Sequence, residues 1–478
     1  MDNAIEVQKS SFWKMSIAER RVLLMVGDFF MAVLSLGIAL YYWGISERFM
    51  GFTIEFLQKR TPLWFYLLPI IWMILLVEFY DVQRAADLGS TIRGIAMAAG
   101  LGFILYLFLF FYYADPPNSL LPRLGVSGFL ITASVLTLIW RLIYIRVFTA
   151  PRFLRRVFLI GGGRTGKLLL QVLNDLRVKP FVVVGVIDDD QEKQGTTLED
   201  IPVIGTSEKL LPLIKEMNIS DLIVSISGEM HGDMFQAVID AQQLGLEITR
   251  MPVTYEELIG RVPIHSLEAN WIIRSFVDES RVSAFYELWK RVIDIIGGLV
   301  GVLIFILVLP FVSLAILIDD GWPIIYGQTR LGKGGRKYRI LKFRTMRRDA
   351  EVNGIPQWAT EADSRTTRFG NLLRKTHIDE IPQFINIFRG EMSLIGPRAE
   401  RPELVGMFQE HIPFYRARLL VKPGITGWAQ VNYGYAANVT ETMVKLEYDL
   451  YYIKNRNLLL DIEILFRTPF MMFGFRGR

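Results

Sequence analysis

The sequence predicts a membrane α plus α/β protein with three parts. Four long apolar runs in the first 150 residues predict an N-terminal four-helix transmembrane bundle, and they explain a mean hydropathy of +0.32. Alternating strand and helix patterns then predict a central Rossmann-like domain. A fifth apolar run opens a C-terminal α/β domain. We expect the bundle at residues 1–150, the Rossmann-like domain at 151–251, a linker at 252–287 and the last domain at 288–478.

The four apolar runs are each close to the ~20 residues that cross a hydrocarbon core. They are Val22–Trp43, Pro62–Phe79, Ile95–Tyr113 and Val126–Phe148. Asp28, Glu78 and Arg141 lie within these runs, where a charge is costly in lipid, so we expect them to face other helices or a membrane edge. Basic residues flank both ends of the bundle, which places both ends in the cytoplasm by the positive-inside rule. The mixed charge of the loop at residues 47–60 argues weakly against this orientation.

The central domain contains a glycine motif after its first strand. Gly161, Gly163 and Gly166 follow an apolar strand and open a helical stretch, and Asp188 lies at about the spacing of a ribose-binding acid. This pattern is typical of a bound nucleotide. It is equally compatible with an empty or regulatory fold whose glycines only make the turn.

The fifth apolar run, Leu288–Ile318, contains Pro310 well inside it. Proline removes a helical hydrogen bond and bends the chain. We therefore favour a re-entrant helix that enters one leaflet, breaks near Pro310 and returns to the same side. A kinked helix that crosses the whole membrane is the alternative.

A strongly basic segment follows. Residues 330–348 contain nine Lys or Arg and no Asp or Glu. This segment is either a surface attracted to anionic lipid headgroups or a cradle for a diphosphate. Lys342 and Arg344 alternate with apolar residues, so we expect both on one strand face, where they could bind substrate phosphate.

The acidic pair Asp379-Glu380 is the strongest candidate for chemistry. Arg374 precedes it, and Arg398 follows in a rigid Gly-Pro-Arg turn. The guanidinium of Arg398 suits bidentate phosphate contact, although a salt bridge to a nearby glutamate would also explain it. Two adjacent carboxylates suit Mg²⁺ that is bound together with substrate phosphates. The chain has no cysteine and only four scattered histidines, which excludes a thiolate nucleophile and disfavours a zinc centre.

These motifs resemble a known family. Residues from about 290 to 473 are similar to the bacterial polyprenyl-phosphate hexose-1-phosphate transferases, also called monotopic phosphoglycosyl transferases. The matching segments are KFRTMRRDAE, LLRKTHIDEIPQFINIFRGEMSLIGPRAERPE, KPGITGWAQVN and KLEYDLYYIKN. The bundle and the Rossmann-like domain match the long form of this family, which acts in exopolysaccharide and O-antigen assembly.

The resemblance implies a reaction and a location. A hexose 1-phosphate would pass from a UDP-hexose (glucose or galactose) to undecaprenyl phosphate, releasing UMP, at the cytoplasmic face of the bacterial inner membrane. Asp379 would be the nucleophile, and Glu380 would help to position Mg²⁺ or the attacking group. Arg374 and Arg398 would bind phosphates. The family's re-entrant helix break, often Ser-Pro, corresponds here to Leu309-Pro310. The long-form family also suggests a homodimer, and nothing suggests a nucleic-acid partner.

Two other function classes remain open at this point. A membrane-anchored NAD-dependent nucleotide-sugar oxidoreductase would use the glycine motif. Residues 151–251 contain no tyrosine for the usual Tyr-x-x-x-Lys acid/base set, which counts against it. A nucleotide-binding membrane scaffold or sensor would need no acidic pair, so its phenotype would survive Asp379→Asn.

Overall fold

A computed structural model describes residues 15, 17–46, 51–112, 123–148, 154–264, 283–347, 365–434 and 438–472. The chain forms two compact units, Met1–Glu257 and Leu258–Arg478, whose boundary falls inside the predicted linker. The linker residues Val262 and Ile264 are buried in the core of the second unit, so this segment is partly structural.

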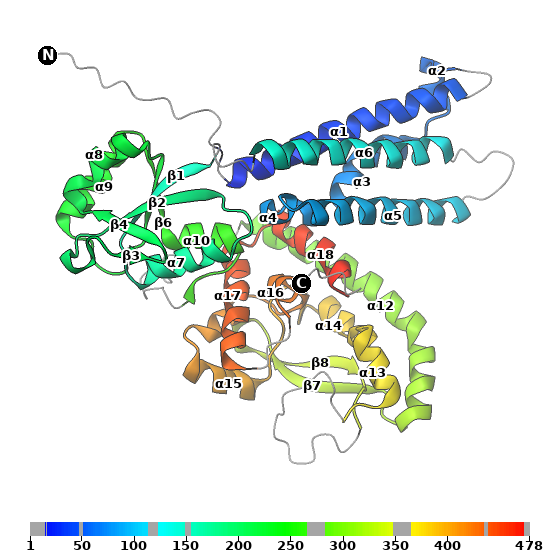
Figure 1. Ribbon diagram of the computed structural model, residues 1–478. Coiled ribbons are helices and arrows are strands. Elements are labelled where there is room, and N and C mark those ends of the chain that lie inside the picture. Colours follow the sequence, from blue (N-terminus) through cyan, green and yellow to red (C-terminus); the bar gives the residue numbers. More distant parts are fainter. Residues whose placement is uncertain are drawn as a thin grey trace. The chain divides into compact units, whose positions relative to one another are not determined.

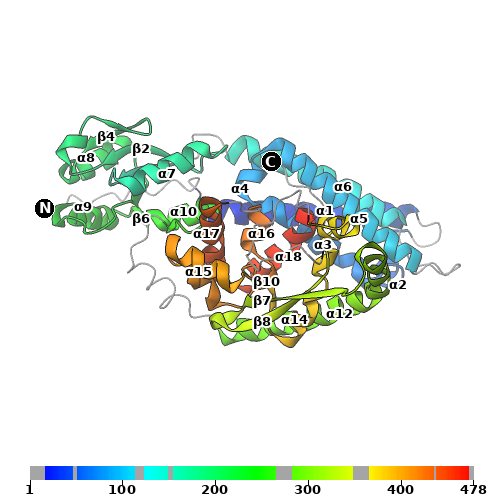
Figure 2. The same cartoon turned by 90° about the horizontal axis from the view of Figure 1, so that it is seen from below.

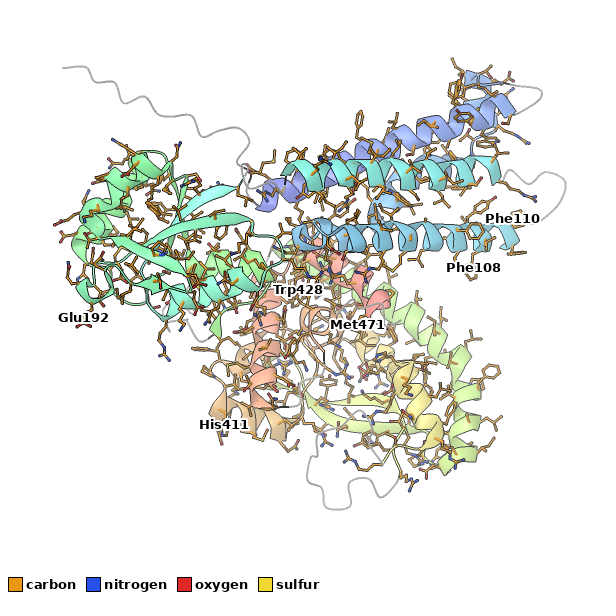
Figure 3. All side chains as sticks on the ribbon, viewed as in Figure 1. Phe108, Phe110, Glu192, His411, Trp428 and Met471 are labelled. Atoms are coloured by element: carbon orange, nitrogen blue, oxygen red, sulfur yellow. The ribbon has the colours of Figure 1, made fainter. Side chains whose placement is uncertain are left out.

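Three long helices form the frame of the N-terminal bundle in unit 1 (Figure 1): α1 (Ile17–Ser46), α5 (Leu88–Tyr112) and α6 (Arg123–Phe148). Each is long and apolar enough to cross a membrane. Their outer faces expose large apolar side chains. Phe108 of α5, for example, is 73% exposed and points away from the bundle in Figure 3. The bundle therefore presents the apolar exterior that a helix needs in lipid.

The second predicted span differs from the other three. Pro62–Phe79 folds into a 3₁₀ helix, η1 (Leu63–Leu67), followed by α3 (Leu68–Leu75) and a second 3₁₀ turn, η2 (Val77–Tyr80). The apolar helical segment Leu63–Leu75 is shorter than a full crossing requires. Proline explains the difference, because it favours helix starts over helix interiors, and Pro69 lies in the first turn of α3. The prediction of four full-length spans in the bundle is therefore wrong at this run. The two remaining short helices are α2 (Ile54–Lys59) and α4 (Val82–Ala85).

A buried ion pair joins the bundle helices, as the cost of charge in lipid predicted. The Arg141 guanidinium contacts the Asp28 carboxylate at 2.6 Å, and both side chains are at most 2% exposed. Arg141 also donates to the carbonyl oxygen of Phe79 at 2.7 Å. The pair thus links α1, α6 and the end of the broken second run.

The central domain of unit 1 is a six-stranded, mostly parallel sheet in the order β3-β4-β2-β1-β5-β6, in which only β3 is antiparallel. Helices α8 and α9 pack on one face of it, and α7 lies on the other (Figure 1). The strands are β1 (Arg155–Ile160), β2 (Phe181–Ile187), β3 (Thr197–Leu198), β4 (Ile201–Gly205), β5 (Asp221–Val224) and β6 (Glu247–Arg250). The helices are α7 (Arg164–Asp175), α8 (Ser207–Met217), α9 (Gly232–Gln243) and α10 (Met251–Ile259), with the 3₁₀ turn η4 (Gln191–Lys193). This is the Rossmann-like arrangement that the alternating pattern predicted.

Unit 2 begins with α12 (Ala284–Asp320), the fourth helix that is long and apolar enough to cross a membrane. The helix is continuous through Pro310, so it is not interrupted there, and it changes direction along its length in Figure 1. Phe305 before the proline and Val312 after it both belong to the cluster of buried residues that includes Phe343. The helix therefore lies against the same domain on both sides of Pro310. Its return to the original leaflet stays a prediction.

The rest of unit 2 is an α/β domain that packs against α12. In Figure 2, α14 lies beside α12 and the β7–β8 hairpin lies next to it. The strands are β7 (Ile325–Leu331), β8 (Lys337–Phe343), β9 (Ser393–Ile395) and β10 (Gly424–Thr426). The α-helices are α13 (Arg368–Lys375), α14 (Gln383–Arg389), α15 (Pro402–His411), α16 (Trp428–Asn432), α17 (Val439–Asn455) and α18 (Leu458–Met472). The 3₁₀ turns are η7 (Lys333–Gly335), η8 (Ile378–Glu380) and η9 (Tyr415–Leu420).

Candidate functional site

The acidic pair lies in η8, the short 3₁₀ turn that follows α13. His377 precedes this turn with φ 55° and ψ 14°, a left-handed conformation that costs free energy for a residue with a side chain. The chain therefore turns sharply just before the pair. Asp379 and Glu380 are both 7% exposed. Buried carboxylates need partners or a function, because transfer of a charge from water is costly.

Glu380 has two cationic partners from distant parts of unit 2. Lys342 of β8 donates from Nζ to Glu380 Oε1 at 2.7 Å, and Arg398 donates from a terminal nitrogen to the same oxygen at 2.5 Å. A second Arg398 nitrogen lies 3.5 Å from Oε2. Burial alone would raise the pKa of Glu380, but Arg398 and Lys342 lower it to well below its usual range. Glu380 is therefore a fixed anion.

Asp379 has a different environment. Within the part of the chain that the structure describes, its carboxylate forms no hydrogen bond or ion pair. Burial raises the pKa of Asp379 above its usual value, and the adjacent charge of Glu380 adds to this effect. Lys342, Arg398 and His377 oppose it in part. The two adjacent carboxylates therefore have different environments. Glu380 is held by two cations, whereas Asp379 is available to react.

Backbone contacts hold the loop that presents Arg398. Strand β9 pairs in parallel with β10, and a further bridge joins Arg398 to Gly424. The backbone oxygen of Arg398 accepts a hydrogen bond from Arg418 at 3.2 Å. The alternative predicted above is a salt bridge between Arg398 and Glu400 or Glu403. Arg398 contacts a different glutamate, Glu380, at 2.5 Å, and Glu400 contacts Arg418 at 3.2 Å.

The other two predicted phosphate-binding residues lie apart from this contact. Arg344 contacts the Asp320 carboxylate at 2.9 Å and donates to the backbone oxygens of Asp320 and Gly321, at the end of α12. It therefore caps a helix instead of facing the acidic pair. Arg374 is half-buried near the end of α13, and its side chain forms no hydrogen bond or ion pair with any described residue. Arg374 is thus available to bind an anion.

The site offers one open ligand for a divalent cation. Among the described residues, no group of three or more His, Asp or Glu side chains is arranged to bind a metal ion. Mg²⁺ is usually bound through one or two carboxylates together with substrate phosphates. Asp379 fits that role, whereas the charge of Glu380 is already balanced by two cations. Metal binding by Asp379 and Glu380 together stays a prediction.

The glycine motif of the central domain forms the expected turn between β1 and α7. Asp188, at the end of β2, accepts a hydrogen bond from the backbone of Gly162 at 2.7 Å and contacts Lys193 at 3.0 Å. Burial would raise its pKa, but these contacts and a hydrogen bond from the backbone of Asp190 lower it. The carboxylate that would bind a ribose is therefore already engaged in fixing the glycine loop. Gly161 has φ +99°, and a side chain on Gly166 would lie 2.6 Å from the oxygen of Gly161, so both glycines are needed for the turn itself.

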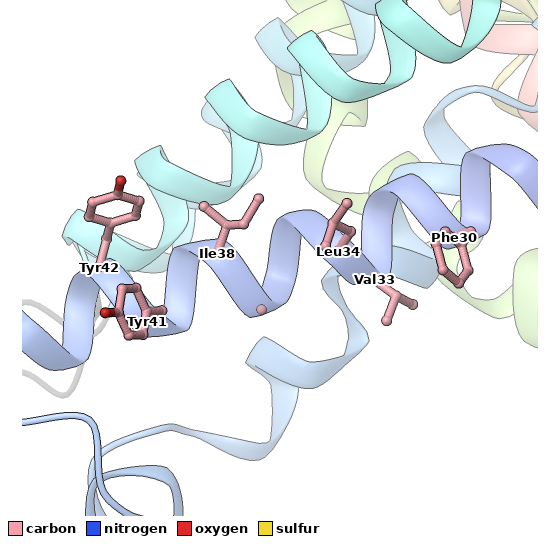
Figure 4. Close-up of a pocket in the computed structure, with 7 residues that line it drawn as sticks. Phe30, Val33, Leu34, Ile38, Tyr41 and Tyr42 are labelled. Atoms are coloured by element: carbon pink, nitrogen blue, oxygen red, sulfur yellow. The ribbon is translucent and has the colours of Figure 1, made fainter.

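An apolar groove on α1 is not part of this site. Figure 4 shows that its lining comes from α1 alone: Phe30, Val33, Leu34, Gly37, Ile38, Tyr41 and Tyr42. The groove lies on a candidate membrane span and is lined by no charged residue.

The sequence analysis did not identify two buried charged residues that contact the segment carrying Arg398. Arg418 is 5% exposed and contacts Asp449 at 2.8 Å as well as Glu400. Asp294 on α12 is 3% exposed and accepts hydrogen bonds from β9. A signal existed for Asp294, because a charge in a strongly apolar helix requires a partner. No such signal marks Arg418, because it lies in a segment rich in arginine.

Two protein families match separate parts of the chain. Residues 285–474 match the family described as bacterial sugar transferase, and residues 76–252 match the family described as CoA-binding domain. The first match covers α12 and the acidic pair, and the second covers the central sheet.

Curated proteins with related sequences extend these matches. A UDP-N-acetylgalactosamine-undecaprenyl-phosphate N-acetylgalactosaminephosphotransferase of Aeromonas hydrophila is 43% identical over 45% of this chain, which spans about half (49%) of that relative. A UDP-glucose:undecaprenyl-phosphate glucose-1-phosphate transferase of Escherichia coli (strain K12) is 38% identical over 67% of this chain and 68% of the relative. A UDP-galactose-lipid carrier transferase of Erwinia amylovora is 28% identical over 66% and 67% of the two chains. With a CoA-binding-like domain ahead of its transferase region, the chain belongs to the long-form bacterial sugar transferases, the polyprenyl-phosphate hexose-1-phosphate transferases.

Proposed function

We propose that this protein transfers a hexose 1-phosphate from a UDP-sugar to undecaprenyl phosphate, giving undecaprenyl-diphosphate-hexose and UMP. This step would begin the assembly of an exopolysaccharide, capsule or O-antigen. The observation that supports it best is the difference between the two adjacent carboxylates. Asp379 is buried and unpartnered among the described residues, whereas Glu380 is fixed by Lys342 and Arg398.

The proposed chemistry has two displacements at one phosphorus atom. A carboxylate oxygen of Asp379 attacks the β-phosphorus of the UDP-sugar, and the bond from this phosphorus to the bridging oxygen of UMP breaks. UMP leaves with that electron pair, and a phosphosugar remains on Asp379. An oxygen of undecaprenyl phosphate then attacks the same phosphorus and releases the Asp379 carboxylate. Covalent catalysis of this kind lets a soluble donor and a lipid acceptor use one site in turn.

The neighbouring charges support the attack of one anion on another. Lys342 and Arg398 both contact the Glu380 carboxylate and supply two positive charges against one negative charge. The surplus favours binding of the diphosphate of the donor. Arg374 is available for a further phosphate contact. Mg²⁺, bound by Asp379 and substrate phosphates, would neutralise additional negative charge in the transition state.

The donor sugar is a separate part of the proposal. Names of the similar proteins include glucose, galactose and N-acetylgalactosamine donors. We propose UDP-glucose or UDP-galactose, since the Escherichia coli and Erwinia amylovora relatives, each matched over about two thirds of this chain, carry those names. UDP-N-acetylgalactosamine is the competing donor, because the Aeromonas relative has the higher identity over its shorter match.

The location of the reaction is also proposed. UDP-sugars are cytosolic, so unit 2 would lie on the cytoplasmic face of the inner membrane. Contacts at both ends of α12 support this, because Asp294 and Asp320 each contact the same α/β domain. A helix that remained with one domain at both ends would return to its original leaflet. The assembly would be a homodimer.

The test is a UMP-release assay with detergent-solubilised full-length protein, Mg²⁺ and undecaprenyl phosphate. The donors are UDP-glucose, UDP-galactose, UDP-N-acetylglucosamine and UDP-N-acetylgalactosamine. We expect UMP from one donor and none from Asp379→Asn. Glu403→Gln is the matched control, because it replaces an exposed carboxylate of α15 by an amide outside the site. Loss of activity in both variants, or UMP from none of the donors with intact acceptor, would contradict the proposal.

A second arm separates the covalent route from direct attack by the lipid. Without undecaprenyl phosphate, the covalent route releases up to one UMP per active site and leaves a phosphosugar adduct that intact-protein mass spectrometry detects. Direct attack by the lipid releases no UMP under these conditions.

A further inference from the structure

A buried carboxylate of the membrane helix contacts the strand that leads to the active-site arginine. Asp294 lies on α12 and is 3% exposed. Its Oδ1 accepts two hydrogen bonds, from Ser393 Oγ at 2.9 Å and from the backbone nitrogen of Leu394 at 2.8 Å. Ser393 itself is fully buried. Both donors belong to β9, so one oxygen atom of α12 fixes two successive residues of this strand.

Backbone N–H groups on either side of Leu394 bond the β10 segment. Ser393 donates its backbone N–H to the oxygen of Pro423 at 2.9 Å, and Gly396 donates to the oxygen of Thr426 at 2.9 Å. Leu394 lies between them in the strand, so its N–H points to the opposite side, toward Asp294. A buried backbone N–H without an acceptor is destabilising. Asp294 therefore completes the hydrogen bonding of β9.

Only Gly396 and Pro397 separate the end of this strand from Arg398, and they leave little room for adjustment. A side chain on Gly396 would lie 2.4 Å from the backbone oxygen of Lys422, so β9 and the β10 segment approach as closely as glycine allows. Pro397 restricts the next backbone torsion. A displacement of β9 would consequently move Arg398, which bonds Glu380 at 2.5 Å.

We propose that Asp294 is a positioning residue that couples membrane helix α12 to the Arg398–Glu380 contact. It touches neither substrate nor the reacting atoms in this scheme. It acts through β9 and the Gly-Pro-Arg turn, so that the placement of α12 sets the placement of the guanidinium beside the acidic pair. This inference rests on the proposed function, because activity is its readout.

The geometry indicates that the acceptor atom of Asp294 matters more than its charge. Both hydrogen bonds end on Oδ1. Asparagine has the same shape and one carbonyl oxygen that can accept both bonds. Asp294→Asn is therefore the conservative variant, and Asp294→Ala is the variant that removes both bonds.

The test measures kcat and KM for the UDP-sugar with full-length protein. We expect Asp294→Ala to lower kcat/KM on the order of tenfold to a hundredfold, as small misplacements of a positioned group do. Asp294→Asn should remain within about threefold of wild type, since it keeps both hydrogen bonds. Equal losses in Asp294→Asn and Asp294→Ala would show that the charge is what matters and would overturn the proposal.

A double-mutant cycle with Arg398→Ala separates positioning from general destabilisation. If Asp294 acts through Arg398, the loss caused by Asp294→Ala should largely disappear in the Arg398→Ala background. Additive losses in variants that unfold at the wild-type temperature would overturn the proposal. If Asp294→Ala does not fold, Ser393→Ala is used in its place, because it removes one of the two donors, and the same cycle decides. Absence of UMP release from wild-type protein would instead count against the proposed function.

Discussion

Lys342 and Arg398 donate hydrogen bonds to the same carboxylate oxygen, Oε1 of Glu380, at 2.7 and 2.5 Å. The first cation comes from the β7–β8 hairpin and the second from the turn after β9, so two separate segments converge on one atom. Two positive charges around one carboxylate leave a net positive charge beside Asp379. Asp379 forms no ion pair with any described residue, and these two cations oppose the rise that burial causes in its pKa.

Replacement of Lys342 by glutamine should shift the pH dependence of the reaction. Burial raises the pKa of Asp379 above the usual value of about 4, and the positive charge of Lys342 opposes that rise. The proposed nucleophile must be deprotonated to attack, so we expect activity to be lost as the pH falls through this raised pKa. Lys342→Gln removes the opposing charge and should move the acidic limb of log(kcat/KM) to higher pH. An unchanged limb would contradict the assignment of this limb to Asp379.

Arg344 and Arg398 should respond differently to the same substitution. Arg344 bonds the end of α12, so Arg344→Gln should lower the free energy of unfolding by about 1–3 kcal/mol through loss of buried charged hydrogen bonds. Its KM for the UDP-sugar should stay close to the wild-type value. Arg398→Gln should instead lower kcat/KM by at least about tenfold. Thermal unfolding and steady-state kinetics of both variants test this prediction. A raised KM for the UDP-sugar in folded Arg344→Gln would indicate that Arg344 binds substrate phosphate.

Glu447 makes the stability of unit 2 depend on pH. It lies on α17, where burial raises its pKa to about 7, although Arg261 and a backbone N–H of Ile264 lower it in part. In the unfolded chain the pKa is near 4.3. Between these two values the unfolded state binds fewer protons, so this group lowers stability as the pH rises from about 4 to 7.

Glu447→Gln should therefore stabilise the protein at pH 8 by about 1–3 kcal/mol, because the amide carries no buried charge. At pH 4 the wild-type side chain is protonated in the folded state, and the two proteins should unfold at similar temperatures. Thermal unfolding in detergent at both pH values provides the comparison. Equal stabilities at pH 8 would mean that Arg261 fully compensates the charge of Glu447.

Two glycines of the central domain should differ sharply in their tolerance of alanine. A Cβ on Gly166 would lie 2.6 Å from the backbone oxygen of Gly161, whereas a Cβ on Gly163 would have no atom within 4 Å. Gly166→Ala should lower the free energy of unfolding of unit 1 by about 1–3 kcal/mol through overpacking. Gly163→Ala should leave stability close to that of wild type. Calorimetry of the two variants tests whether this motif is chiefly a packing device.

Much of the architecture follows from local pattern. The apolar lengths of α1, α5 and α6 and the strand–helix alternation around the glycine motif predicted bundle and sheet, because length and periodicity act within a single element. The division of Pro62–Phe79 into short helices could not be predicted in this way. Hydropathy measures only apolar content, and it does not show where a proline begins a new helix. Asp28 and Arg141 were each expected to face another helix, but the sequence did not predict that they would pair with each other.

The sequence by itself determined the acidic pair Asp379-Glu380, because two adjacent carboxylates between basic residues form a local signal. Only the tertiary structure decided that Lys342 and Arg398 contact Glu380, and that Asp379 has no ion-pair partner among the described residues. Lys342 and Arg344 look alike in the sequence, yet one contacts Glu380 and the other caps α12. Asp294 and Ser393 lie about a hundred residues apart and meet only when α12 packs on β9. Charge type is a property of the residue, whereas the partner of a charge is a property of the packing between distant elements.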